Sequence, residues 1–85
     1  GKEIDMSIEK VWVGIIPEIN GGYGVNVIAK SEEEAMSLLR REYNKIQRIS
    51  CYPIEVKTFD KAMEYFGGEV KEIALNKVYY DGFKE

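Results

Sequence analysis

The residue types that most often carry acid–base or nucleophilic chemistry are scarce in this chain. It contains no histidine, which removes the commonest general base and the commonest transition-metal ligand near neutral pH. Cys51 is the single cysteine, so the chain offers no cysteine-based zinc site. Asp60 and Glu64 stand four residues apart, a spacing that places both carboxylates on one solvated helix face. We therefore expect no catalytic residues, no metal site and no cofactor, and we predict that the protein is not an enzyme.

The glycine-rich segment 20–24, Asn-Gly-Gly-Tyr-Gly, superficially matches a phosphate-binding loop. Phosphate loops work because their amides converge at the start of a helix, and a P-loop continues with Lys-Ser or Lys-Thr. Here the glycines lead into a predicted strand, and no such pair follows them. A hairpin turn is therefore the better interpretation.

Aromatic residues are the more informative signal, with six tyrosines, three phenylalanines and one tryptophan among 85 residues. Helical spacing assigns Tyr43, Phe59 and Phe66 to the core. The remaining aromatic residues include several that no predicted core face claims. Exposed apolar patches usually mark interfaces, and Trp and Tyr often anchor protein contacts.

Strand alternation places Trp12, Ile16 and Ile28 on the sheet face opposite the predicted core face. Tyr79 and Tyr80 lie close together near the C-terminus. We predict that these five residues bind a partner. The alternative is that a terminal segment of the chain covers this face.

A basic stripe, Arg41, Lys45 and Arg48, follows a spacing of four and then three residues on the longest predicted helix. It supports an alternative function as a nucleic-acid-binding regulator. Segment 31–48 holds four acidic and four basic residues, however, so the helix is neutral as a whole. The net charge of −3 gives no electrostatic attraction for nucleic acid or an anionic membrane, so we consider both partners unfavoured.

The segment Ser31–Gln47 has the clearest helical pattern in the chain. Ser31 is a good N-cap, and Glu34 completes the Ser-x-x-Glu capping box. Steps of three and four residues place four apolar side chains on one stripe. They are Ala35, Leu39, Tyr43 and Ile46. This stripe must be buried, and a sheet is its natural partner in so short a chain.

Two predicted strands, Ile8–Ile16 and Tyr23–Lys30, precede this helix. Both alternate in hydrophobicity, and the turn residues between them predict an antiparallel hairpin. Pairing Val13 with Val27 would turn both valine-rich faces toward the helix and leave Trp12 on the other face.

Three further elements are predicted after the long helix. A third strand covers Ile54–Lys57, and a short helix over Phe59–Phe66 ends at Gly67. A fourth strand covers Glu69–Tyr80, either as one irregular strand or as a hairpin that turns at Asn-Lys. We favour the single strand, because Asn-Lys lacks the glycine that a two-residue turn prefers.

This order, β-β-α-β-α-β, predicts an α+β fold: a two-layer sandwich in which two helices cover one face of a mostly antiparallel four-stranded sheet. We expect residues 1–85 to form one small domain, with residues 1–7 as a flexible lead-in. No apolar run approaches the roughly 20 residues that a membrane helix needs. The single cysteine fits a reducing compartment, so we expect a cytoplasmic protein.

The segment Val11–Leu39 combines a strand hairpin, the run Gly-Gly-Tyr-Gly-Val and the run Ser-Glu-Glu-Glu-Ala at a helix start. In these features it resembles the start of HicB-type antitoxins. The chain lacks the Pro-Asp-Leu-Pro-Gly-type segment of those proteins, and its 85 residues show no DNA-binding unit. The resemblance therefore implies a hairpin followed by a helix, and we assign no family from it.

Together these patterns favour a small regulatory module that binds a protein partner or a second copy of itself, for example as an inhibitor of a cellular or phage-related target. Two alternatives stay open at this point. One is the nucleic-acid-binding regulator that uses the basic stripe. The other is a small-ligand sensor, or an accessory domain of an enzyme, with a pocket between the sheet and the helices.

Overall fold

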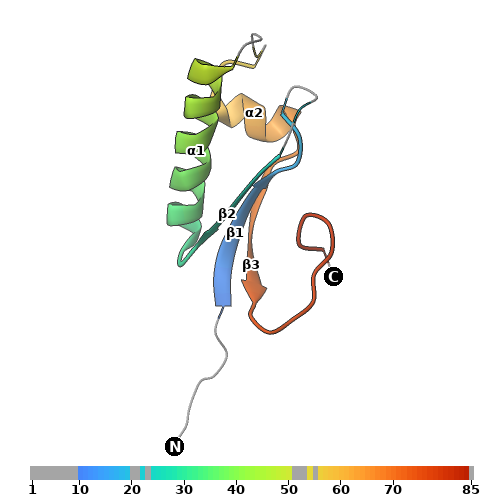
Figure 1. The fold of residues 1–85 in the computed structure, drawn as a ribbon. Coiled ribbons are helices and arrows are strands. Elements are labelled where there is room, and N and C mark those ends of the chain that lie inside the picture. The colour runs from blue at the N-terminus through green and yellow to red at the C-terminus, as the bar shows by residue number, and fades with distance from the viewer. Residues whose placement is uncertain (1–9, 20–21, 23, 51–53, 55, 85) are drawn as a thin grey trace, which may run out of the picture.

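The structure is a computed structural model that describes residues 10–19, 22, 24–50, 54 and 56–84. Its elements are β1 (Lys10–Ile16), β2 (Val25–Ala29), α1 (Glu32–Ile49), α2 (Phe59–Tyr65) and β3 (Glu69–Ala74). The strands form an antiparallel sheet in the order β2-β1-β3, so β1 lies in the centre (Figure 1). The predicted α+β class is confirmed. Residues 1–7, which we expected to form a flexible lead-in, lie outside the described residues.

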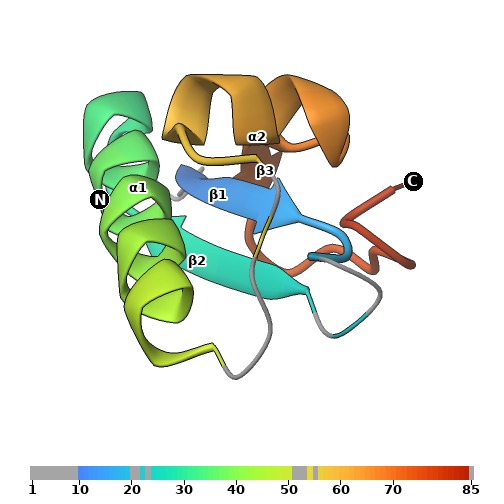
Figure 2. The same cartoon turned by 90° about the horizontal axis from the view of Figure 1, so that it is seen from above.

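Both faces of the sheet are covered, each by a different part of the chain. The two helices lie on one face, and the segment after β3 returns along the other (Figures 1 and 2). The larger core lies between the sheet and the helices and is built around Ile16, Leu39 and Tyr43. The smaller core lies on the far face, where Val13, Ile15 and Ile73 pack together.

The long helix forms as its sequence pattern predicts. The Ser31 hydroxyl accepts a hydrogen bond from the Glu34 amide at 3.1 Å and donates one to the Glu34 carboxylate at 3.3 Å, which satisfies the start of α1. Three glutamates in the first turn complement the helix dipole. The predicted stripe is buried in full, and its members are Ala35, Leu39, Tyr43 and Ile46.

The hairpin forms, but its predicted register is wrong. Val13 pairs with Ile28, and Gly14 pairs with Val27. Since paired residues share a face, Trp12, Gly14 and Ile16 lie on the helix side of the sheet, and the intervening valine and isoleucine side chains point to the far face. The prediction failed because both faces of β1 are apolar, and alternation alone does not say which face meets the helix.

The predicted third strand is also wrong. Residues 54, 56 and 57 form no strand, although Ile54 is buried and Val56 is half-buried. The Val56 carbonyl accepts hydrogen bonds from the Tyr43 hydroxyl and from Gln47 Nε2, the latter at 2.8 Å. Side chains of α1 thus satisfy a backbone group that a strand would have offered to a ladder. The described part of the chain has three strands in the order β-β-α-α-β, in place of the predicted four.

The last predicted strand is shorter than expected. β3 ends at Ala74, and the chain bends at Leu75 and Asn76, where Asn76 has a positive φ of 58°. Asparagine tolerates this left-handed conformation better than most residues, so the Asn-Lys pair does mark a turn. The chain then runs back and closes a small loop, in which the Tyr80 amide donates to the Lys84 carbonyl at 2.7 Å.

The short helix α2 agrees with its prediction to within one residue. The Thr58 hydroxyl accepts a hydrogen bond from the Lys61 amide at 3.4 Å and caps its start. Gly67 follows the helix with a φ of 73°, which allows the chain to turn into β3. Phe59 and Ala62 bury the helix against α1 and the sheet.

Substitution of Gly14 tests how closely α1 approaches the sheet. A Cβ atom at Gly14 would lie 2.7 Å from Leu39 Cδ1 and 2.9 Å from Val27 Cγ2. Leu39 is fully buried, so it cannot move into solvent to make room for the added methyl group. We expect Gly14→Ala to lower the free energy of unfolding by about 1–3 kcal/mol in urea denaturation. The control is a double-mutant cycle: Leu39→Ala should cost less in the Gly14→Ala background than alone, and strict additivity would contradict the clash.

The buried phenol of Tyr43 predicts a pH dependence of stability. Burial raises the pKa of Tyr43 above its ordinary value of 10.0, and a hydrogen bond with Gln47 opposes this by a smaller amount. The folded state therefore favours the neutral phenol, so its contribution is complete below pH 10 and is lost as the pH rises through the folded-state pKa.

We expect Tyr43→Phe to be about 1 kcal/mol less stable than the wild type at pH 7, because it lacks the hydrogen bond to Val56. Above pH 10 this difference should shrink, since only the wild type must ionise a buried phenol. Thermal melts of both proteins from pH 7 to pH 11 measure it, and a constant difference across that range would contradict the assignment.

Candidate protein-binding surface

Three apolar residues that the sequence pattern assigned to one sheet face differ in position and exposure in the structure. Ile16 is fully buried in the core between the sheet and the helices. Trp12 is half-buried on the same side of the sheet. Ile28 lies on the far face and is 62% exposed. Of these three residues, only Ile28 exposes most of its side chain to a partner.

The C-terminal segment covers much of the far face, whereas the alternative prediction expected a terminal segment over the face of Trp12, Ile16 and Ile28. Tyr79 and Phe83 pack against the cluster of Val13, Ile15 and Ile73, and their ring centroids lie 6.2 Å apart. The Tyr79 hydroxyl also accepts a hydrogen bond of 3.0 Å from the backbone amide of Ala74. Tyr79 is therefore a structural residue that fixes this segment to β3.

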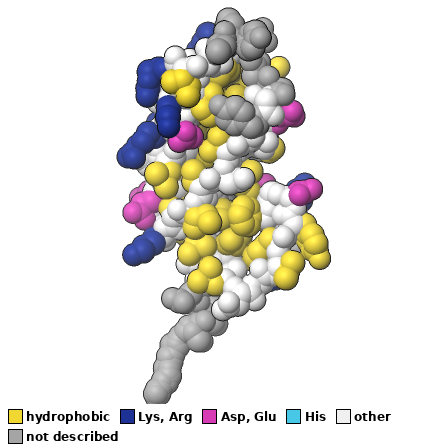
Figure 3. All heavy atoms as spheres, in the orientation of Figure 1, with side chains coloured by type: hydrophobic (Ala, Val, Ile, Leu, Met, Phe, Trp, Pro, Cys, Tyr) yellow, Lys and Arg dark blue, Asp and Glu magenta, His cyan; other side chains and the backbone are white. Residues whose placement is uncertain are grey.

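The C-terminal segment exposes three apolar side chains among polar and charged ones. Tyr80 is 72% exposed and Val78 is 71% exposed, and Leu75 at the preceding bend is 45% exposed. Figure 3 shows hydrophobic side chains gathered on this segment and on the neighbouring strands. Sequence reasoning found Tyr80 but missed Leu75 and Val78, because it assigned both to a strand.

The two outer strands of the sheet differ in charge. β3 carries Glu69, Lys71 and Glu72 within its six residues. β2 reads Val-Asn-Val-Ile-Ala and carries no charge. Edge strands usually avoid unwanted pairing through charged side chains, proline or bulges, and β2 has neither charge nor proline. Among the described strands, β2 and β3 each pair with β1 alone, so each has an unpaired outer edge. The outer edge of β2 has fewer features that oppose pairing with another strand.

Sequence reasoning missed this edge because it placed a fourth strand in the sheet and left the strand order open. The signal was present in the uncharged run between Gly24 and Lys30. It becomes meaningful only when the topology shows that this strand is an outer one.

The basic stripe Arg41, Lys45 and Arg48 lies on the exposed surface of α1. Lys45 approaches Glu42 of the same helix at 3.9 Å, so an acidic group interrupts the stripe. Arg40, which the sequence did not single out, approaches Asp60 of α2 at 3.9 Å and lies 5.3 Å from the centre of the Phe59 ring. These contacts show an ion-paired helix surface with both signs of charge.

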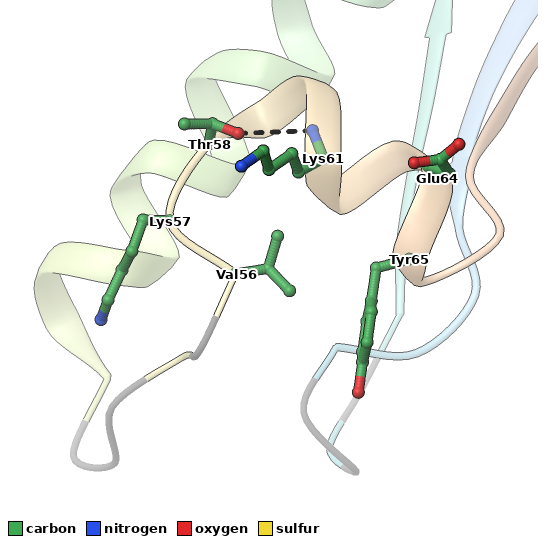
Figure 4. Close-up of a pocket in the computed structure, with 6 residues that line it drawn as sticks. All are labelled: Val56, Lys57, Thr58, Lys61, Glu64 and Tyr65. Carbon is green, nitrogen blue, oxygen red and sulfur yellow. Dashed lines mark hydrogen bonds between the residues drawn. The ribbon is translucent and has the colours of Figure 1, made fainter.

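A hollow of about 550 Å³ lies beside α2 (Figure 4). Val56 and Tyr65 face one another across it, while the Lys57 side chain extends away from it. Its lining residues are Val56, Lys57, Thr58, Lys61, Glu64 and Tyr65. Of these, all but Val56 are exposed, so the hollow is an open surface groove with few converging polar groups.

The described residues contain no group of three or more Cys, Asp or Glu residues placed to hold a metal ion. No helix in the described ranges is both long and apolar enough to cross a membrane.

The adjacent tyrosines 79 and 80 provide a matched test of the C-terminal segment. We expect Tyr79→Ala to lower the free energy of unfolding by about 2 kcal/mol, because it removes packing on the far face and the hydrogen bond to Ala74. Tyr80→Ala removes a side chain that is 72% exposed and should change it by less than about 0.5 kcal/mol. Urea denaturation measures both, and equal effects would contradict the packing described here.

No family model, curated protein or solved structure matches this chain. Its function must therefore be inferred from its own geometry.

Proposed function

We propose that this protein is a non-enzymatic module that binds another protein through the outer edge of β2. The observation that carries this proposal is an uncharged outer strand with an isoleucine that is 62% exposed. An outer strand presents a row of backbone N–H and C=O groups to any extended segment that lies beside it. Addition of a strand satisfies these groups and supplies affinity through main-chain hydrogen bonds.

Side chains around this edge would supply selectivity. Ile28 projects from β2 on the far face of the sheet, where Val13 lies opposite it. Val78 and Tyr80 project from the C-terminal segment on the far side of the sheet. In Figure 3 hydrophobic side chains gather on the strands and on this segment within one view of the molecule. A partner strand with apolar side chains on one face would bury Ile28.

The opposite edge of the sheet is a poorer candidate. Alternating charges on β3 would have to be matched or desolvated by an added strand. The end of β3 is also occupied, because the Ala74 amide donates to the Tyr79 hydroxyl. The difference between the two edges supports β2 as the binding edge.

The lack of histidine and the single cysteine support a role in binding over a role in catalysis. The same cysteine content supports action in a reducing compartment such as the cytoplasm.

Substitution of Ile28 tests this function. A tagged protein is used to capture partners after nuclease treatment, each partner is then purified, and its Kd is measured for the variants. Ile28→Lys places a charge on the edge and should weaken binding by about tenfold or more. Tyr65→Lys is the matched control, because Tyr65 is 69% exposed on α2, and it should leave the Kd within about twofold.

Circular dichroism must show that both variants fold like the wild type. Equal affinity of Ile28→Lys and wild type for every purified partner would overturn the β2 edge as the binding site. Capture that disappears with nuclease would favour the nucleic-acid alternative instead.

A further inference from the structure

We infer that the partner of the β2 edge is a second copy of this chain. In this pairing, two three-stranded sheets join into one sheet of six strands. This inference rests on the proposed function, because it uses the same edge. In it, β2 of each copy pairs antiparallel with β2 of the other about a two-fold axis, and the two α1 helices lie side by side on one face.

The position of α1 over the sheet sets the distance between the two helices. α1 packs most against β1 and β2 and also touches β3, so it lies between the β1–β2 seam and β1. Neighbouring strands are about 4.8 Å apart. A second β2 at the same spacing would therefore place the two α1 axes about 10–14 Å apart, at or slightly beyond the distance at which helices pack and within reach of long charged side chains.

The side of α1 that would meet the second copy is the one turned away from α2. Arg40 contacts Asp60 and Phe59, and Gln47 bonds to the Val56 carbonyl, so this side of α1 faces α2 and the connection to it. Figure 2 shows α2 near β1 and β3, with β2 on the other edge of the sheet.

The residues on the opposite side of α1 follow one another at steps of three and four. It carries Glu34, Leu38, Glu42, Lys45 and Ile49. Ile49 is 63% exposed and Leu38 is half-buried, so this side has apolar groups between its charges. Figure 3 shows charged side chains of both signs along α1, beside hydrophobic side chains on the strands.

The charges on this side are self-complementary in an antiparallel pair. A two-fold axis through the paired strands makes the two α1 helices antiparallel. Val27 and Leu39 both crowd Gly14, so they lie at the same level of the sheet. With the strands centred on Val27, residues at similar distances from Leu39 face each other. Glu34 stands five residues before Leu39 and Lys45 six residues after it, so Glu34 of one copy comes within one residue of facing Lys45 of the other.

The rest of this pairing is also compatible with identical partners. Leu38 lies near the axis and meets its counterpart, with one Glu34–Lys45 pair on each side. β2 is uncharged, so two copies of it meet without any opposition of like charges. Centring on Val27 keeps the valines of both strands on the helix side and sets Ile28 across from Asn26 on the far face.

A charge exchange tests this arrangement in solution. Sedimentation equilibrium of the full chain should show a dimer for the wild type, and Lys45→Glu should raise the dimer dissociation constant by about tenfold or more, because it sets glutamates against each other. The double variant Glu34→Lys, Lys45→Glu restores opposite charges and should return the constant to within about threefold of the wild type. Lys61→Glu, the same charge change on α2, is the matched control and should have no such effect.

Ile28→Lys should also abolish the dimer, because it places a charge on the shared edge. A wild type that stays monomeric at about 1 mM would overturn the inference. So would a dimer that withstands both Lys45→Glu and Ile28→Lys, since it would use another surface. If the wild type is monomeric but Ile28→Lys still weakens a different purified partner, the inference fails while the proposed function stands.

Discussion

The fold depends on the close approach of Leu39 to Gly14. Because position 14 has no side chain, the fully buried Leu39 of α1 sits directly against the central strand, with Val27 of β2 beside it. This contact sets which face of the sheet receives the helices, and therefore that Ile16 is core and Ile28 is not. It also fixes the height of α1 over the strands and hence which helix residues stand level with the outer edge of β2.

A second constraint limits the described sheet to three strands. The segment after α1 returns toward α2, and the Val56 carbonyl bonds to Tyr43 and Gln47 of α1. Ile54 joins the helix-side core directly and Val56 packs against that core, and neither residue lies in a strand. The consequence is a sheet in which β2 and β3 are both outer strands.

These two outer strands differ in charge and in their contacts with the rest of the chain. The difference leaves the outer edge of β2 more open to another strand than that of β3. β3 has alternating charges, and the returning C-terminal segment binds its last amide through Tyr79. β2 is uncharged, and the side of α1 nearest to it mixes apolar residues with charges of both signs. An edge that avoids charge, beside a helix surface with charges of both signs, supports the proposed assembly by strand addition.

Local patterns in the sequence were sufficient to determine α1, α2 and the hairpin. Ser31, Thr58 and Gly67 act through their own backbone neighbours, and the helical stripe follows from a 3.6-residue period that no strand shares. The tertiary structure alone decided the hairpin register, the absence of strand structure at residues 54, 56 and 57 and the role of Tyr79. A period of two says which residues share a face but not which face is covered by helices, and here both faces are apolar because both are covered. The proposed binding edge likewise became apparent only when the strand order placed the uncharged β2 on the outside.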